Sequence, residues 1–458
     1  MLTPLWLETI LPVLPTHDDW ATTIKPDFNP FFIKERFLFY GYHWRPFDAM
    51  MGYILGTNPQ VLYPILNHYF IVIGHTICAI LIFKLLSTLK FTTFSKNITT
   101  VYFFITPSTM ATITAVDSMN QVYALLCGII SFLFYVKLEK GKYVAWICML
   151  FIATWFKENG LMWALIGPVL TYGFDLINQR RLKRDLLIGL GVIAVYGLAI
   201  FLLPREIIIH PDYEPDIIKV IKNIIKFLFT TFITVDYIYL LHQPSRNLIV
   251  AIFTFALSLP FLYYIFIKKS RQFLNKKMVC TMFCMIIAVA PHISTVFSMM
   301  HTYAGLAMLT ILIAYSIDCY MEHRKSVIIT FLLFCLSAVM IDIHLVNASI
   351  KSGRIGKKMA QEAIRKTGKP VKSVYVIIIE DEYPKLSSFC VIPYEAFGWG
   401  LASQYETNYQ WPKTIKDTTI VHSLDAVKHA KQLASKVLLK DSIDCVWIIN
   451  HDNVDVIK

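Results

Sequence analysis

The chain has 458 residues, of which 56% are hydrophobic and 16% charged, with a formal net charge of +12. This composition excludes an ordinary soluble domain and predicts an integral membrane protein. The excess of lysine and arginine lies largely in short loops between apolar segments, so we exclude nucleic acid as a partner and expect contact with anionic membrane lipids.

The chain starts with a short apolar segment, and a polar segment follows it. Residues 1–15 are fewer than the roughly 20 apolar residues of a membrane span, and Pro4 and Pro12 lie among them. They form either the last part of a first span that is truncated or an interfacial helix, and they lack the basic start and cleavage site of a signal peptide. Residues 31–56 are aromatic and partly charged, which indicates a helix on the outer leaflet.

Apolar runs long enough to cross a hydrocarbon core of about 30 Å recur along the following part of the chain. Together with the first segment they predict a polytopic α-helical membrane protein of about 11 spans. The runs lie near residues 62–89, 97–115, 119–137, 143–156, 160–178, 185–203, 247–267, 278–299, 303–320 and 326–345. Between two of them, the segment 216–240 has lysines opposite an isoleucine face and is typical of an interfacial helix.

The last part of the chain has the composition of a soluble domain. Its pattern alternates helices and strands, which predicts a small α/β domain without a Gly-rich phosphate loop. We expect helices at 350–367, 395–405 and 424–439, and strands at 374–380, 418–423 and 444–450. The predicted domains are therefore a polytopic part, residues 1–346 with external loops at 16–61 and 204–246, and a soluble extracytoplasmic part, residues 347–458.

Lysine and arginine mark one side of the membrane. They collect in alternate connections, and short basic loops stay cytoplasmic. The basic connections are near residues 90–96, 137–142, 180–184, 268–277 and 324–325. The other connections and the last domain are then extracytoplasmic, and a bacterial inner membrane is the expected location.

Polar residues that could carry chemistry gather at the predicted external ends. Asp18 and Asp19 stand in the sequence "THDDW", where they form either a solvated or helix-capping turn or a functional pair. A carboxylate can take the proton of an incoming hydroxyl, and a cation can stabilise a phosphate leaving group. His75 lies inside an apolar run and is expected to be a hydrogen-bonded core histidine. The other members of the set are His43, Arg45, Asp48, Asn67, His68, Asp117, Lys157, Glu158, His292 and His301.

Four stretches in this order carry a resemblance: "THDDW", "HWRPFDAMMGYILG" with the run after it, "ITAVDSMNQ" and "WFKENGLMWALIGPVL". They resemble the membrane-embedded glycosyltransferases of the GT-C superfamily, and look closest to bacterial relatives of protein O-mannosyltransferases and of the lipid A aminoarabinose transferase. The resemblance covers about the first 180 residues by motif. It implies a polyprenyl-phosphate sugar donor, and in many members an external C-terminal domain.

The resemblance also implies roles for single residues. Asp19 matches a general base and Asp18 its partner or a metal-site carboxylate, while Asp117 matches a second acid that binds substrate or metal. The divalent metal would be Mg or Mn. Donor-phosphate contacts are implied for Lys157, Arg45 and His301, although His301 stands where the family has an arginine. Further substrate contacts are expected from Glu158, His43 and His68.

The sequence thus predicts a glycosyltransferase that moves a sugar from a polyprenyl-phosphate donor to a lipid, glycan or protein acceptor on the extracytoplasmic face. A polysaccharide polymerase would also use a large external loop. A flippase or transporter of lipid-linked oligosaccharide would instead place acids in the middle of the membrane, whereas most acids here lie at span ends.

Overall fold

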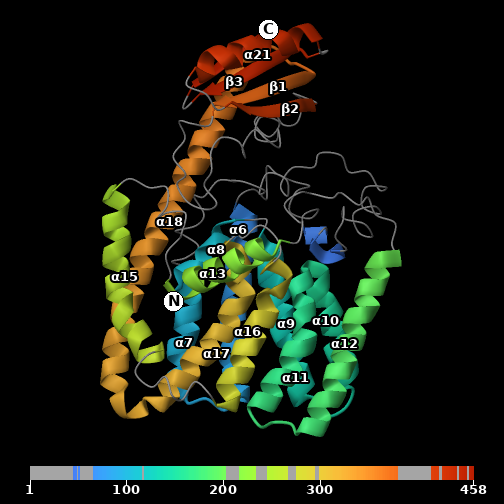
Figure 1. Cartoon of the computed structure of the whole chain (residues 1–458), viewed down its shortest axis with the longest axis vertical. Helices are drawn as coiled ribbons and strands as arrows, with labels where there is room; N and C mark the ends of the chain where they lie inside the picture. Colours follow the sequence, from blue (N-terminus) through green and yellow to red (C-terminus); the bar gives the residue numbers. More distant parts are fainter. Residues whose placement is uncertain are drawn as a thin grey trace.

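The computed structural model describes residues 45–48, 50–51, 65–115, 118–202, 216–233, 245–266, 275–293, 299–379, 414–421, 425–440, 443–450 and 453–458. Within them, one long helix joins a bundle of helices to a small sheet (Figure 1). The bundle elements are α6 Ile65–Thr88, α7 Thr93–Ile105, η1 Pro107–Thr109, α8 Met110–Thr114, α9 Met119–Lys137, α10 Lys142–Phe156, η3 Glu158–Met162, α11 Trp163–Gly173, α12 Gln179–Leu202, α13 Ile217–Ile233, α15 Ser245–Phe266, α16 Lys276–Ile293, η6 Met299–Thr302, α17 Tyr303–Cys319, η7 Met321–His323 and α18 Arg324–Thr367.

Every apolar run predicted from the sequence contains a helix in the structure, so the polytopic α-helical fold is confirmed. In the described part of the chain, six helices are long and apolar enough to cross a membrane; they lie in α6, α9, α12, α16, α17 and α18. The run 97–115 was predicted as one span, but in the structure it is divided into α7, η1 and α8. Thr106 is extended, with φ −68° and ψ 132°, because Pro107 disfavours a helical residue before it.

Helix α17 is the centre of the bundle. Its residues from Tyr303 to Ala314 are all buried, and it packs against α16, α7 and α9. A helix that is apolar all round suits a place in the core of a large protein or inside a membrane. His75 of α6 confirms the prediction of a core histidine: its Nε2 faces the Phe104 carbonyl at 3.2 Å, and its Nδ1 lies 2.8 Å from the Tyr303 hydroxyl. Nε2 therefore donates to the carbonyl and Nδ1 accepts from the hydroxyl.

Helix α12 is at the edge of the bundle (Figure 1), and its two sides differ. Leu187, Leu190 and Leu198 are exposed, as expected for side chains that face lipid tails. On the opposite side Gly189 is buried against α11. A glycine lets two helix backbones approach closely, which is how membrane helices gain packing energy in the absence of a hydrophobic driving force.

Helix α18 connects the membrane part to the last domain. The predicted span 326–345 and the predicted helix 350–367 form one helix of 44 residues, about 66 Å long at 1.5 Å per residue. No proline interrupts it, and it ends where Gly368 adopts a left-handed conformation with φ +72°. The helix therefore carries the last domain away from the bundle on a continuous support (Figure 1).

The last domain is a four-stranded sheet with the order β2-β1-β3-β4. Strand β1 pairs in parallel with β2 and β3, and β4 pairs antiparallel with β3. One face is covered by α21, and the end of α18 packs on β3 and β4, where the Trp447 indole donates to Thr367. Strands covered on both faces are apolar throughout, as β1 and β3 are. The bounds are β1 Ser373–Ile379, β2 Thr414–Val421, α21 Ala426–Lys440, β3 Cys445–Asn450 and β4 Asn453–Ile457.

Four expected elements of this domain agree with the structure, and one further strand is new. Strands predicted at 374–380, 418–423 and 444–450 correspond to β1, β2 and β3, and the helix predicted at 424–439 corresponds to α21. Strand β4 was not expected. It has only five residues and starts soon after β3, so its hydrophobic alternation is too short to identify a separate strand. The helix expected at 395–405 lies outside the described residues.

The two ends of the bundle carry different polar groups. The basic loops gather at one end, where Lys276 pairs with Asp175 at 2.6 Å and Arg324 lies over the Phe94 ring. The sheet rises from the opposite end (Figure 1). Connections that alternate between basic and non-basic along the sequence therefore lie at alternating ends of the bundle in the described part of the chain. Which end faces the cytoplasm stays a prediction.

We predict that Gly189→Ala destabilises the protein. A Cβ at this position would lie 2.4 Å from the carbonyl oxygen of Ala164, and a helix backbone cannot move aside without cost. We expect a loss of about 1–3 kcal/mol in the free energy of unfolding. Gly191→Ala on the same helix is the control, because no atom lies within 4 Å of its Cβ. Thermal unfolding in detergent measures both, and equal midpoints would contradict the close packing of α11 and α12.

Candidate functional site

An ion pair joins the first described residues to the turn after α10. The Nε of Arg45 donates to Glu158 Oε1 at 2.8 Å and its Nη2 to Oε2 at 2.5 Å. Both side chains are largely buried, with exposed fractions of 12% and 24%. Burial alone would lower the pKa of Arg45, but the Glu158 carboxylate raises it above its usual value. Arg45 is therefore a permanent cation in a fixed orientation.

The turn that carries Glu158 has a local cause. Helix α10 ends at Phe156, and Lys157 is extended with φ −159° and ψ 146°. Gly160 then brings the backbone back against α10, so closely that a Cβ there would lie 2.4 Å from the carbonyl carbon of Ala153. In an extended segment neighbouring side chains point apart, so Lys157 and Glu158 can have different partners.

A second network links Asp48 to Lys157 through Asn120. The amide nitrogen of Asn120, in the first turn of α9, donates to Asp48 Oδ2 at 3.3 Å. The Lys157 ammonium donates to the amide oxygen of Asn120 at 3.4 Å and is 7% exposed. Burial raises the pKa of Asp48, and the nearby charges of Arg45 and Lys157 offset this only in part. Asn120 therefore holds an acid and a cation in one place.

Two histidines border the same region. The rings of His292, near the end of α16, and His301, in η6, are stacked with centroids 4.1 Å apart and an angle of 2°. Helix α16 packs against η3, the turn that follows Lys157, and against η6, so the two histidines lie beside the turn that carries Lys157 and Glu158. The Nδ1 of His301 is buried and has no hydrogen-bond partner among the described residues. This nitrogen is available to a ligand.

The structure brings together four of the residues predicted from the sequence: Arg45, Lys157, Glu158 and His301. His68 is buried near the start of α6, which is the same end of the bundle. The other predicted residues, Asp18, Asp19, His43 and Asp117, lie outside the described residues. In the described ranges no group of three or more His, Cys, Asp or Glu side chains could hold a metal ion.

Three members of the site were not assigned a role from the sequence. Asp48 and His292 were noticed only as polar residues at predicted external ends, and Asn120 only as part of a connection. A polar amide in the first turn of an apolar helix is a usable signal, because burying it without a partner is costly. Pattern alone could not pair it with Asp48, which lies 72 positions earlier in the chain.

The arrangement suits an anionic group. Arg45 and Lys157 are fixed cations, and His301 offers a buried nitrogen beside them. A phosphate placed there would be held by charge-assisted hydrogen bonds in a site of low exposure, where such bonds are strong. Glu158 and Asp48 limit the net charge of the site.

No protein-family model matches the chain, and no curated protein matches it. Two solved structures are similar to it, both of ArnT from Cupriavidus metallidurans. The structure with bound undecaprenyl phosphate has 11% sequence identity and a TM-score of 0.49, and the match covers 99% of this chain and 96% of that one. The apo structure has 11% identity and a TM-score of 0.47, with 97% and 90% covered.

We predict that Glu158→Gln destabilises the protein, because Arg45 would stay buried without its carboxylate. Breaking a buried ion pair costs about 3–5 kcal/mol, and the residual exposure here places the expected loss near the lower value. Asp175→Asn is the matched control, since it breaks the solvent-exposed pair with Lys276 and should lower the midpoint much less. Thermal unfolding of both variants tests this, and a Glu158→Gln midpoint equal to that of the control would contradict it.

Proposed function

We propose that this chain is a glycosyltransferase that moves a sugar from a polyprenyl-phosphate donor to a lipid, glycan or protein acceptor. The observation that carries the proposal is the meeting of Arg45, Lys157 and His301 at one end of the membrane bundle, away from the basic loops. A lipid-linked phosphate lies at this depth, because its chain stays in the bilayer while its charged group stays at the edge.

The donor contributes a phosphate as the leaving group. When the bond between the sugar carbon and the phosphate oxygen breaks, negative charge accumulates on polyprenyl phosphate. Arg45 and Lys157 stabilise this charge more strongly than they stabilise the intact donor, so they favour the transition state. Glu158 acts on Arg45 and orients it, and Asn120 does the same for Lys157. Further contacts to the sugar are assigned to His43, His68 and Asp117.

The acceptor contributes a hydroxyl group, which is a poor nucleophile until its proton is removed. We assign the base to Asp19 and an orienting or metal-binding role to Asp18. The hydroxyl oxygen forms the new bond to the sugar carbon as the proton passes to the carboxylate. Asp48 is a weaker choice for the base, because it already accepts a hydrogen bond from Asn120. A Mg or Mn ion held by Asp18 and Asp117 remains a proposal, and no step depends on it.

One buried acid favours the alternative of a flippase or transporter. Asp342 lies in the membrane-spanning part of α18, is 1% exposed, and neither of its oxygens has a hydrogen-bond partner within the described part of the chain. Acids inside spans are typical of proton-coupled transport. A transporter moves the sugar lipid intact, whereas a transferase releases polyprenyl phosphate. Incubation of purified protein with polyprenyl-phosphate sugars, followed by measurement of the sugar left on the lipid, separates the two.

The first test concerns the acid pair. Asp18→Asn and Asp19→Asn keep the size of the side chain but cannot take up a proton. We expect Asp19→Asn to lower the rate of sugar transfer by about 10²–10⁴, the usual cost of losing a general base. Turnover is compared at matched expression and thermal stability. Wild-type turnover in both variants would make the pair a solvated turn and overturn the assignment of the base to Asp19.

The second test concerns the donor. Lys157→Ala and Arg45→Ala should each weaken donor binding by about thirtyfold or more, because removing a cation beside a desolvated phosphate costs about 2–5 kcal/mol. Lys183→Ala, an exposed lysine at the basic end, is the control and should bind as the wild type does. Binding of a labelled polyprenyl-phosphate sugar measures this. Unchanged affinity in both variants would make the two residues interfacial anchors.

The third test concerns sidedness, which we propose to be extracytoplasmic for the site and for the last domain. Ser435 is exposed on α21, and Lys183 is exposed at the basic end. A cysteine at position 435 should react with a membrane-impermeant thiol reagent in intact cells, and a cysteine at position 183 only after lysis. The parent protein gives the background of the native cysteines. The reverse pattern would place the site in the cytoplasm.

A further inference from the structure

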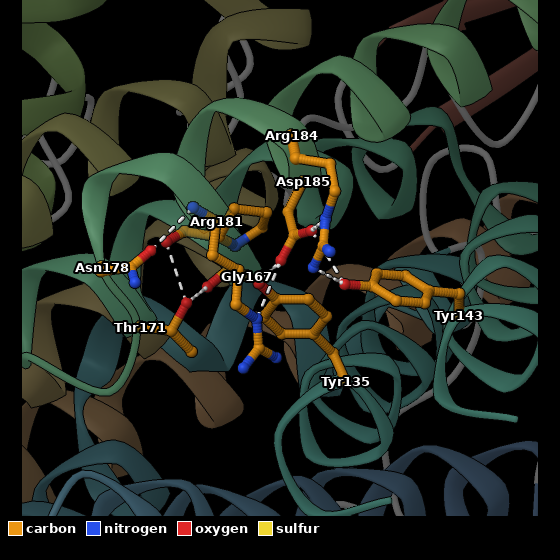
Figure 2. Close-up of polar contacts among 9 residues, drawn as sticks. Tyr135, Tyr143, Gly167, Thr171, Asn178, Arg181, Arg184 and Asp185 are labelled. Carbon is orange, nitrogen blue, oxygen red and sulfur yellow. Dashed lines mark hydrogen bonds and ion pairs between the residues drawn. The ribbon is translucent and has the colours of Figure 1, made fainter. Parts of the chain in front are cut away.

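The basic end of α12 contains a network around one buried carboxylate (Figure 2). Asp185 is fully buried and accepts hydrogen bonds from the hydroxyls of Tyr135 and Tyr143. It also accepts from the Nε of Arg181 at 3.3 Å and from the Nε of Arg184 at 3.0 Å. One carboxylate therefore fixes two guanidinium groups, and the three charged side chains together keep a net positive charge.

Each arginine is held by more than its ion pair. The guanidinium of Arg181 lies over the Tyr135 ring, 5.7 Å from its centroid, and that of Arg184 lies 5.4 Å from the Tyr143 centroid. A terminal nitrogen of Arg184 also donates to the Tyr143 hydroxyl. These contacts restrict the two side chains before any ligand arrives, so little conformational entropy is lost on binding.

The network leaves donors for a ligand. Arg181 meets Asp185 through its Nε, and Figure 2 shows its terminal nitrogens turned away from the carboxylate. These nitrogens have no hydrogen-bond partner among the described residues. The side chains of Arg181 and Arg184 are 32% and 59% exposed. Planar guanidinium groups with outward donors match the oxygens of a phosphate.

The local backbone adds to this positive field. Asn178 caps α12, since its side-chain oxygen accepts from the backbone N–H of Arg181 at 2.9 Å. The positive end of the helix dipole therefore lies beside the two arginines. Lys142 from the start of α10 joins the group, with its ammonium 5.4 Å from the centroid of the Tyr143 ring.

An apolar stripe begins where the arginines end. Leu187 and Leu190 follow Arg184 at three-residue steps, so they share its side of the helix. They are 69% and 51% exposed, and Leu198 further along is 57% exposed. The two arginines thus lie at the membrane edge, and an exposed apolar stripe leads from them into the bilayer. This combination suits a lipid, which has both a charged group and apolar chains, better than a free anion.

We infer that this end of α12 is a specific site for an anionic phospholipid, with the lipid phosphate on Arg181 and Arg184 and an acyl chain along Leu187 and Leu190. The inference is independent of the sugar transfer proposed above, because it uses other residues at the other end of the bundle. Asp185 acts as a positioning residue, which sets both guanidinium groups without touching the lipid.

The test uses the full chain in detergent micelles doped with phosphatidylglycerol, phosphatidylcholine or no lipid. Binding is measured by native mass spectrometry and by the thermal midpoint. We expect phosphatidylglycerol to bind and to raise the midpoint, whereas phosphatidylcholine and free inorganic phosphate do not. The double variant Arg181→Gln/Arg184→Gln should bind phosphatidylglycerol at least about tenfold more weakly.

The matched control is Arg180→Gln/Lys183→Gln, which removes the same charge from exposed neighbours on the same helix turn. It should bind within about twofold of the wild type. Equal losses in both double variants would overturn the inference and leave only a diffuse basic surface, and so would an effect of inorganic phosphate equal to that of the lipid. If the first double variant unfolds because Asp185 loses its partners, adding Asp185→Asn removes the stranded charge, and the same loss of binding is expected.

Discussion

The cost of placing an ionised side chain in hydrocarbon determines where most charged groups lie in the described part of this protein. That cost is at least about 2.5–3.5 kcal/mol for a single charge at the centre of the bilayer. Most of these charges are collected at the two ends of the bundle, and those that are buried there have polar or charged partners, whereas Asp342 inside α18 is an exception. Arg45 with Glu158 at one end and Asp185 with its two arginines at the other are the clearest examples.

The charged groups at the two ends of the bundle are arranged in different ways. At the site end the cations come from separate elements, the short turn at Arg45 and the turn after α10, and their orientation is set by acidic or amide partners. At the basic end the cations come from one helix turn around one acid. The first arrangement draws its cations from different elements through largely buried contacts, which suits the proposed donor phosphate. The second presents its charges on the outer surface, which suits a lipid that stays.

Close backbone contacts keep these two ends in fixed relation. Gly189 brings α12 against α11, and Gly160 brings the turn with Lys157 and Glu158 against α10. Helix α17 fills the centre, and its Tyr303 contacts His75 on α6. Because packed interiors resist small displacements, a polar group at one end of such a helix is held in place by the packing of the whole helix. Helix α18 transfers the same rigidity to the sheet beyond the bundle.

The sequence by itself determined the membrane class, the positions of the helices in the ten apolar runs, the alternation of basic loops and most of the last domain. These follow from hydrophobic length and periodicity, which are local properties of the chain. It also selected Arg45, Lys157, Glu158 and His301 as residues of one site. What only the tertiary structure decided is how such residues pair: Arg45 with Glu158 across 113 positions, and Asp48 with Lys157 through Asn120. Pairs of this kind depend on how helices pack, and no local pattern in the chain records which helix ends meet.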